Sequence, residues 1–147
     1  MKLDRATNDD VAVICNYVTD ELHQLGFMDT YGMSIHIEAA LKDSDVWKVV
    51  TDDGLLVAFG AVEDVNPTTL HVISYYIAKP YRQTIAAYLI SKKMIELMEP
   101  YNNIVYIPLA ENQQLPTRFC RDNRIDKVAL KQFIERFDKR WEVAQKQ

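Results

Sequence analysis

The stretch that decides the fold is Tyr75-Tyr-Ile-Ala-Lys-Pro80-Tyr-Arg-Gln-Thr-Ile85-Ala-Ala-Tyr-Leu89. Its first residues predict a strand, the part around Pro80 a short basic turn, and the alanine-rich end the start of a helix. A helix that begins just beyond a strand directs backbone N–H groups and the positive end of its dipole toward whatever lies there. Together with the cation Arg82, this geometry favours an anion such as a phosphate group.

Length and composition limit the class of protein. The chain has 147 residues, 48% hydrophobic and 26% charged, which predicts one globular domain over residues 1–147. The net charge of −4 disfavours nucleic acid and anionic membranes as partners. No apolar run is long enough to span a membrane, and acidic residues come too early for a secretory signal. Cys15 and Cys120 lack zinc or disulfide spacing, and the histidines are too scattered for a metal site, so we expect a cytoplasmic, metal-free protein.

Hydrophobic periodicity and turn residues predict the order of the elements. We expect strands over residues 3–6, 46–50, 55–62, 70–77, 104–109 and 128–137. We expect helices over residues 7–22, 34–41, 84–98 and 115–123, and a polar tail from about residue 138. Turn signals at Asp53-Gly54 and Asn66-Pro67 separate the second, third and fourth strands. This order is typical of an α/β domain with a mixed sheet.

Three segments resemble the Gcn5-related N-acetyltransferase family. The opening Leu3-Asp-Arg-Ala-Thr-Asn-Asp-Asp10 resembles its first strand and helix cap, residues 75–89 its cofactor motif, and residues 115–125 its late helix. With the order of elements, the resemblance covers nearly the whole chain. It implies a mixed, mostly antiparallel central sheet that is flanked by helices, with the fourth and fifth strands splayed apart.

The resemblance also implies a site for acetyl-CoA as co-substrate. In the family, pantetheine lies between the splayed strands and bonds to main-chain groups near the end of the fourth strand, which here are those of Tyr76, Ile77 and Ala78. The pyrophosphate loop falls on Arg82, Gln83, Thr84, Ile85, Ala86 and Ala87. Arg82 and Ala87 fit the family pattern. Ile85 stands where glycine is expected, and a β-branched side chain hinders close approach of a phosphate to the backbone. An ordinary capped helix packed on a sheet is the alternative.

Candidates for a general base lie on the third and fourth strands. Two-residue alternation predicts that His71 shares a face with Ile73, Tyr75 and Ile77. His71 occupies the register in which many relatives carry a glutamate base, and an imidazole suits removal of a proton from an ammonium group. Glu63 is a rival base, as is its neighbour in the sequence, Asp64. The structural alternative is a half-buried strand histidine with a satisfied hydrogen bond.

Candidates near the end of the chain rest on the same resemblance. Cys120 stands where relatives often carry the tyrosine that protonates the leaving thiolate; a buried apolar filler is the alternative. Tyr106 and Tyr88 are other phenols that could serve as this acid. Asn112 is either a pantetheine contact or a turn residue. On the predicted late helix, a basic cluster could bind adenosine phosphates or an acidic partner, or it could simply be a solvated face. Its members are Arg118, Arg121, Arg124 and Lys127. Asn123 suits a left-handed helix end.

Two functions follow from these observations. The first is an acyl-CoA-dependent N-acetyltransferase that moves an acetyl group to a small-molecule or protein amine, with the Ile77 N–H polarising the thioester carbonyl. The second is a non-catalytic binding or assembly module of the same fold, as in bacteriophage structural or host-interaction proteins, acting as a homodimer or with a protein partner. Ile85, Cys120 and Arg124, each in place of a family residue, favour the module. The retained turn at Pro80 to Arg82 favours the enzyme, which we expect narrowly.

Overall fold

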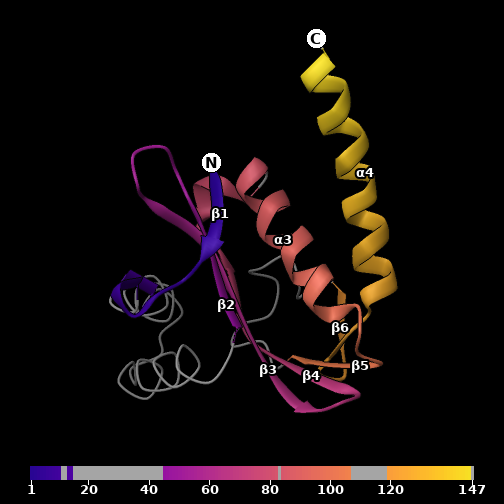
Figure 1. Ribbon diagram of the computed structural model, residues 1–147. Helices are drawn as coiled ribbons and strands as arrows, with labels where there is room; N and C mark the ends of the chain where they lie inside the picture. Colours follow the sequence, from indigo (N-terminus) through magenta and orange to yellow (C-terminus); the bar gives the residue numbers. More distant parts are fainter. Residues whose placement is uncertain (11–12, 15–44, 83, 107–118, 147) are drawn as a thin grey trace.

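The computed structural model describes residues 1–10, 13–14, 45–82, 84–106 and 119–146 (Figure 1). In chain order, the elements are β1 (Lys2–Arg5), η1 (Asn8–Asp10), β2 (Asp45–Val50), β3 (Leu56–Asn66), β4 (Thr69–Ile77), η2 (Lys79–Tyr81), α3 (Ile85–Met98), β5 (Asn103–Tyr106), β6 (Cys120–Arg121), β7 (Arg124–Ile125) and α4 (Lys127–Lys146). Of the expected helix over 7–22, the structure describes residues 7–10 and 13–14: residues 8–10 form η1 and residues 13–14 are helical. The rest of that helix and all of the expected helix over 34–41 lie outside the described residues, as does the expected helix over 115–123 before residue 119. No helix in the described ranges is long and apolar enough to cross a membrane.

The described strands form one sheet in the order β1-β2-β3-β4-β5-β7-β6. Every neighbouring pair is antiparallel except β4 and β5, which run parallel. The parallel pair requires a crossover, which α3 provides because it follows β4 and precedes β5. The predicted α/β class with a mixed, mostly antiparallel sheet is therefore confirmed.

Two tight turns join β2, β3 and β4. Gly54 has a φ of +84°, a conformation that is unfavourable for any residue with a side chain. Its N–H donates a hydrogen bond to the Thr51 carbonyl. In the next turn, the Asn66 side-chain oxygen accepts a hydrogen bond from the Thr68 N–H at 2.9 Å. Both turns lie where the sequence predicted them, although β3 extends four residues beyond the predicted end.

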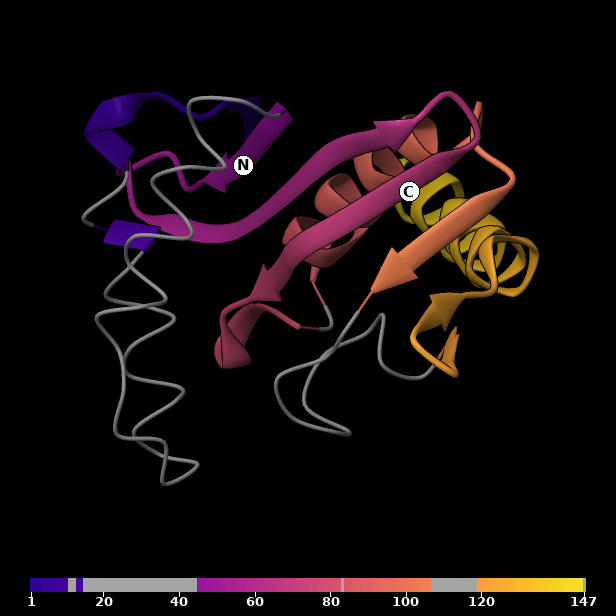
Figure 2. The same cartoon turned by 90° about the horizontal axis from the view of Figure 1, so that it is seen from below.

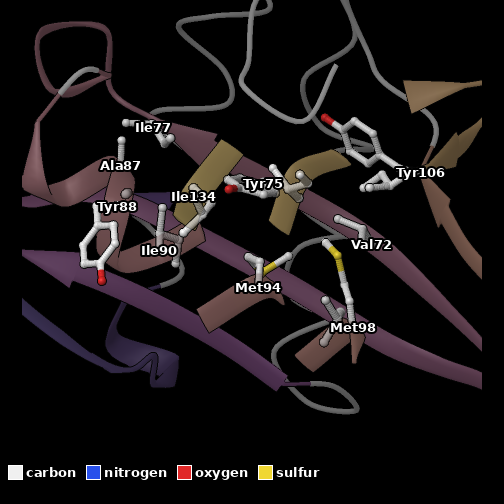
Figure 3. Packing of buried hydrophobic residues seen from close by; sticks show 14 of the residues in the cluster. Val72, Tyr75, Ile77, Ala87, Tyr88, Ile90, Met94, Met98, Tyr106 and Ile134 are labelled. Carbon is white, nitrogen blue, oxygen red and sulfur yellow. The ribbon is translucent and has the colours of Figure 1, made fainter. Parts of the chain in front are cut away.

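Helix α3 packs on one face of the sheet, with α4 beside it (Figure 1). Thr84 caps the helix, because its Oγ1 accepts the Ala86 N–H at 3.3 Å. The buried side of α3 includes Ile90, Met94 and Met98, which meet strand residues such as Val72 (Figure 3). A smaller apolar cluster lies on the other face and contains Ile14, Val46, Leu56, Phe59, Ala61, Tyr76 and Ala78.

The C-terminal part differs from the prediction. Residues 120–123, expected in a helix, belong to the hairpin β6–β7, and residues 128–137, expected in a strand, belong to α4. The hairpin turn places Asp122 and Asn123 at φ of 52° and 61°, as a two-residue turn requires, so Asn123 is left-handed in a hairpin instead of at a helix end. Asp126 caps α4 by accepting the Ala129 N–H at 3.0 Å.

The strand prediction for residues 128–137 was wrong because it overlooked a helical period. Leu130, Phe133, Ile134 and Phe137 follow the i, i+3, i+4, i+7 spacing of one helix face. Leu130 and Ile134 are buried in the α3-side core, and the other two pack against it. The segment after residue 138, expected as a polar tail, continues as helix through Lys146.

Candidate functional site

The described pairing of the fourth and fifth strands covers part of β4. It runs in parallel from Thr69 to Val72 on β4, and its last described pair joins Val72 to Tyr106. Strand β4 runs on to Ile77, toward the turn η2 that leads into α3 (Figure 2). We call the end of this described pairing the fork. The residues that follow Tyr106 lie outside the described ranges, so the predicted splay stays a prediction.

A β-bulge in β4 lies next to the fork. On β3, the neighbours Ala61 and Val62 pair with Ser74 and Val72, so one residue of β4, Ile73, has no partner. The extra residue reverses the face on which the preceding side chains of β4 lie. His71 therefore lies on the face of Tyr76, not on that of Tyr75 and Ile77 as simple alternation predicted. That prediction was wrong because a bulge leaves no clear sign in the sequence.

The two candidate bases are direct neighbours across the strands. Glu63 of β3 pairs with His71 of β4 in the strand register, and His71 Nδ1 lies 2.9 Å from Glu63 Oε1. The side chains are 25% exposed for His71 and 41% for Glu63. Sequence reasoning treated these two residues as rivals, whereas the structure joins them in one hydrogen-bonded pair. The third candidate, Asp64, instead accepts a hydrogen bond from the Tyr101 hydroxyl.

The main chain at the end of β4 divides its hydrogen bonds between two sides. The Ala78 N–H bonds to the Val57 carbonyl on β3 at 2.8 Å. In an antiparallel ladder, this bond makes Ala58 and Ile77 a pair without mutual hydrogen bonds, so the Ile77 N–H and carbonyl point away from β3. The same alternation directs the groups of Tyr75 away from β3, and those of Tyr76 toward it. Tyr75 was not among the predicted contacts, and its register depends on pairings that the sequence does not show.

Arg82 returns to the end of β4. Its Nε donates a hydrogen bond to the Ile77 carbonyl at 3.0 Å. Arg82 closes the short 3-10 helix η2, whose proline fixes the direction of the chain between strand and helix. The guanidinium therefore lies beside main-chain groups that the resemblance associates with pantetheine.

The loop before α3 uses several of its backbone N–H groups internally. The Thr84 N–H bonds to the Tyr81 carbonyl at 3.3 Å, the Ala86 N–H to Thr84 Oγ1, and the Ala87 N–H to the Thr84 carbonyl at 3.1 Å. Ile85 is the first residue of α3 and is partly buried against the core. Gln83 and Asn112 lie outside the described residues. These contacts neither test nor exclude the predicted phosphate site, which stays a prediction.

Cys120 lies close to the fork. It is half-buried on β6, and its Sγ donates a weak hydrogen bond to the carbonyl of Tyr106, the last paired residue of β5, at 3.5 Å. Burial raises the pKa of the Cys120 thiol, so the thiol is a weaker acid than a free cysteine.

Tyr88, one of the two candidate phenols, lies on α3 and bonds to α4. The Tyr88 hydroxyl donates a hydrogen bond to Asp138 on α4, and it accepts one from Lys92 Nζ at 2.9 Å. Burial and the bond to Asp138 raise the pKa of Tyr88. Its ring stacks on Phe137 of α4, so Tyr88 joins the two helices.

The basic cluster is divided in the structure. Arg121 and Arg124 are exposed on the β6–β7 hairpin, and Arg118 lies outside the described residues. Lys127 Nζ donates to the carbonyls of Glu99 and Tyr101, at 3.2 Å and 2.6 Å. It thereby caps the carboxyl end of α3, where a cation is favourable.

Comparisons with known proteins rest on structure. No protein-family model and no curated protein matches the sequence. A probable acetyltransferase aligns over 77% of this chain and 82% of its own, with a TM-score of 0.60 and 14% identity. A putative GNAT-family acetyltransferase from Staphylococcus aureus aligns over 73% of this chain and 100% of its own, with a TM-score of 0.58 and 12% identity. A putative acetyltransferase from Exiguobacterium aligns over 84% of this chain and 89% of its own, with a TM-score of 0.58 and 14% identity. At such identities the likeness concerns the fold alone: the chain has the Gcn5-related N-acetyltransferase fold.

Proposed function

We propose that the protein is an acyl-CoA-dependent N-acetyltransferase that moves an acetyl group from acetyl-CoA to an amine. The observation that carries the proposal is the edge of β4 beyond the fork. In the described residues, β4 continues past its last pair with β5 and directs the main-chain groups of Tyr75 and the N–H of Ile77 away from β3, while the Ile77 carbonyl accepts the Arg82 bond. Main-chain groups at a strand edge need hydrogen-bonding partners, and the amides of a pantetheine arm supply both donors and acceptors.

In the proposed reaction, the amine nitrogen attacks the thioester carbonyl and the bond from carbon to sulfur breaks. The Ile77 N–H polarises the carbonyl oxygen, where negative charge develops. Either His71 or Glu63 takes the proton that the amine loses, and Cys120 or a tyrosine returns a proton to the coenzyme A thiolate. Arg82 and the loop through Ala87 hold the pyrophosphate, with Arg82 supplying the charge.

A second candidate is a non-catalytic binding or assembly module of the same fold, such as those of bacteriophages. One observation favours it. Backbone N–H groups at Thr84, Ala86 and Ala87 bond within the chain, and the Arg82 side chain bonds to Ile77. A phosphate would have to compete with these hydrogen bonds. The polar groups of the loop are thus already bonded, as in an ordinary helix cap that binds no ligand.

The test is the thermal midpoint of unfolding with and without millimolar acetyl-CoA. Ligand at a hundredfold over its Kd stabilises the folded state by about 2.7 kcal/mol. For a domain of this length, that corresponds to roughly several degrees. Transfer itself is then followed as thiol release from acetyl-CoA with propylamine, spermidine or an alanine tripeptide as acceptor.

Two variants locate the site. Arg82→Glu reverses the charge beside Ile77 and is expected to remove the acetyl-CoA shift, whereas Arg136→Glu makes the same change on the exposed side of α4 and leaves the shift intact. Absence of a shift in the wild-type protein would favour the assembly module and direct the search to protein partners.

A further inference from the structure

The Glu63–His71 pair has a defined hydrogen-bond polarity. The carboxylate of Glu63 only accepts hydrogen bonds when it is ionised, so the Nδ1 that lies 2.9 Å from its Oε1 must carry the proton. In a neutral imidazole, protonation of Nδ1 leaves the lone pair on Nε2. Glu63 therefore selects the tautomer in which the outer nitrogen of His71 is the base.

The strand register makes this contact a fixed one. Glu63 and His71 are directly opposite each other on neighbouring antiparallel strands, where side chains on one face approach closely. The bulge at Ile73 puts His71 on the same face as Glu63, opposite α3. On this face β5 contributes Asn103 and Val105, so Glu63 is the titratable group that the described neighbouring strands present to His71.

The pair also lies at the fork. His71 pairs with Val105, one position before the final pair of β4 and β5. Tyr75, whose main-chain groups point away from β3, lies three residues beyond Val72. Both side chains are partly exposed, so an incoming group can reach the pair from this face.

We propose that Glu63 and His71 act as one proton-accepting unit, in which Glu63 positions the imidazole and Nε2 takes a proton from a primary alkylammonium substrate. This rests on the proposed acetyl transfer. Glu63 is then a positioning residue and not a second base, which resolves the choice between the two candidates.

The chemistry balances in two steps. The ammonium loses a proton to Nε2, so that its N–H bond breaks and an imidazolium forms, hydrogen-bonded to the Glu63 carboxylate. The neutral amine then attacks the acetyl-CoA carbonyl; the carbon–nitrogen bond forms, the carbon–sulfur bond breaks, and the thiolate leaves with the bonding electrons. The attacking nitrogen gives up its second proton, which the thiolate takes to form the coenzyme A thiol. Nε2 returns the first proton to solvent.

The experiment reads the tautomer directly. Nitrogen-15 NMR of the full chain distinguishes the two ring nitrogens of His71, whose signals are assigned by their loss in His71→Asn. Glu63→Leu removes the acceptor, and we expect Nε2 to gain the proton in place of Nδ1. Glu63→Gln keeps an amide oxygen, and we expect Nδ1 to stay protonated. The matched control Asp64→Asn removes the adjacent charge and leaves the ring unchanged.

Acetyl transfer from acetyl-CoA to propylamine gives the second readout. A positioned general base contributes about 100-fold or more, so Glu63→Leu and His71→Asn should each lower kcat by that order while the KM for acetyl-CoA is kept. Because both changes remove the same base, the double variant should lose little more than either single one. Glu63→Gln should retain most of kcat.

The outcomes separate the two proposals. An unchanged tautomer in Glu63→Leu overturns the positioning role. A changed tautomer with unchanged kcat overturns proton acceptance at Nε2 while acetyl transfer stands. A wild-type protein without any acetyl transfer overturns the proposed function and proton acceptance with it, whereas the tautomer shift still shows whether Glu63 holds the ring.

Discussion

The two halves of β4 are held in different ways. From Thr69 to Val72, the strand has hydrogen-bonded neighbours on both sides, β3 and β5. From Ser74 to Ile77, it pairs with β3 alone among the described strands, and the bulge at Ile73 separates the halves. Backbone hydrogen bonds to two neighbouring strands hold the first half. The second half is also supported by α3, which packs beneath it, and by Arg82, which lies beyond its end.

Side chains provide that support in the second half. Below the strand, the Tyr75 hydroxyl donates to the buried Ser91 hydroxyl of α3 (Figure 3 shows Tyr75 among the core residues). Beyond it, Arg82 bonds to Ile77. The comparison teaches that, where a strand has one described neighbour, a helix packed beneath it and a side chain beyond its end can hold it in place.

The largest expected change in stability comes from disrupting the packing of α3 against the second half of β4. Gly60 pairs with Tyr75, and a Cβ at Gly60 would lie 2.4 Å from Met94 Sδ in the core. Gly60→Val overpacks this contact and should destabilise the protein by about 3 kcal/mol, the upper part of the usual range. Chemical denaturation measures the change.

A double-variant cycle with Met94 serves as its control. Gly60→Ala and Met94→Ala each cost stability, but the cavity left by Met94 makes room for the new methyl group. The combined cost should therefore be smaller than the sum of the two. Simple additivity would show that α3 does not meet β3 at this point.

A smaller effect is expected from the buried hydroxyl pair. Tyr75→Phe leaves the Ser91 hydroxyl buried without its partner and should cost about 2 kcal/mol. Burial raises the pKa of Tyr75 strongly, so the hydroxyl stays neutral across the ordinary pH range and the cost should not change between pH 6 and pH 9. Tyr75→Phe with Ser91→Ala should recover part of the loss; no recovery would argue against the pairing.

A still smaller loss is expected at the helix cap beyond the strand. Thr84→Ala removes the Oγ1 that accepts the Ala86 N–H and should destabilise α3 by about 1 kcal/mol. Thr84→Ser keeps the hydroxyl and should cost little. If the alanine variant also binds acetyl-CoA more tightly, the freed N–H is available to the pyrophosphate, and the two uses of the loop compete.

The last prediction concerns the reactivity of the Cys120 thiol, which lies near the end of the described pairing between β4 and β5. Because burial raises the pKa of Cys120, less thiolate is present at pH 7 than for a free cysteine. In a Cys15→Ser background, alkylation should be slower in the folded protein than in urea and should rise at higher pH. Equal rates would mean that the thiol near Tyr106 is fully accessible.

Much of the fold was readable from the sequence because its signals are local. The turns at Gly54 and Asn66 depend on residue types with special backbone or side-chain properties, and the Thr84 cap on a hydroxyl two residues before the N–H it accepts. The segment 128–137 carried an equally local signal, its helical period, and was mispredicted because that period was overlooked. The likeness in fold to acetyltransferases followed from element order.

The site was less readable because it depends on register. Glu63 and His71 were both named, but eight residues of sequence separation do not show that they are hydrogen-bonded. Their contact follows from the β3–β4 hairpin, and their face from the bulge at Ile73. Arg82 was predicted for its charge, yet its bond to Ile77 depends on how η2 turns the chain.

The sequence by itself determined the strands through β5, their turns and helix α3, since periodicity, glycine and capping residues act within a few positions. Only the tertiary structure decided on which face His71 lies and that Glu63 lies within hydrogen-bonding distance of it. Those features arise from pairing between strands, and a single inserted residue reverses them without changing the composition of either strand.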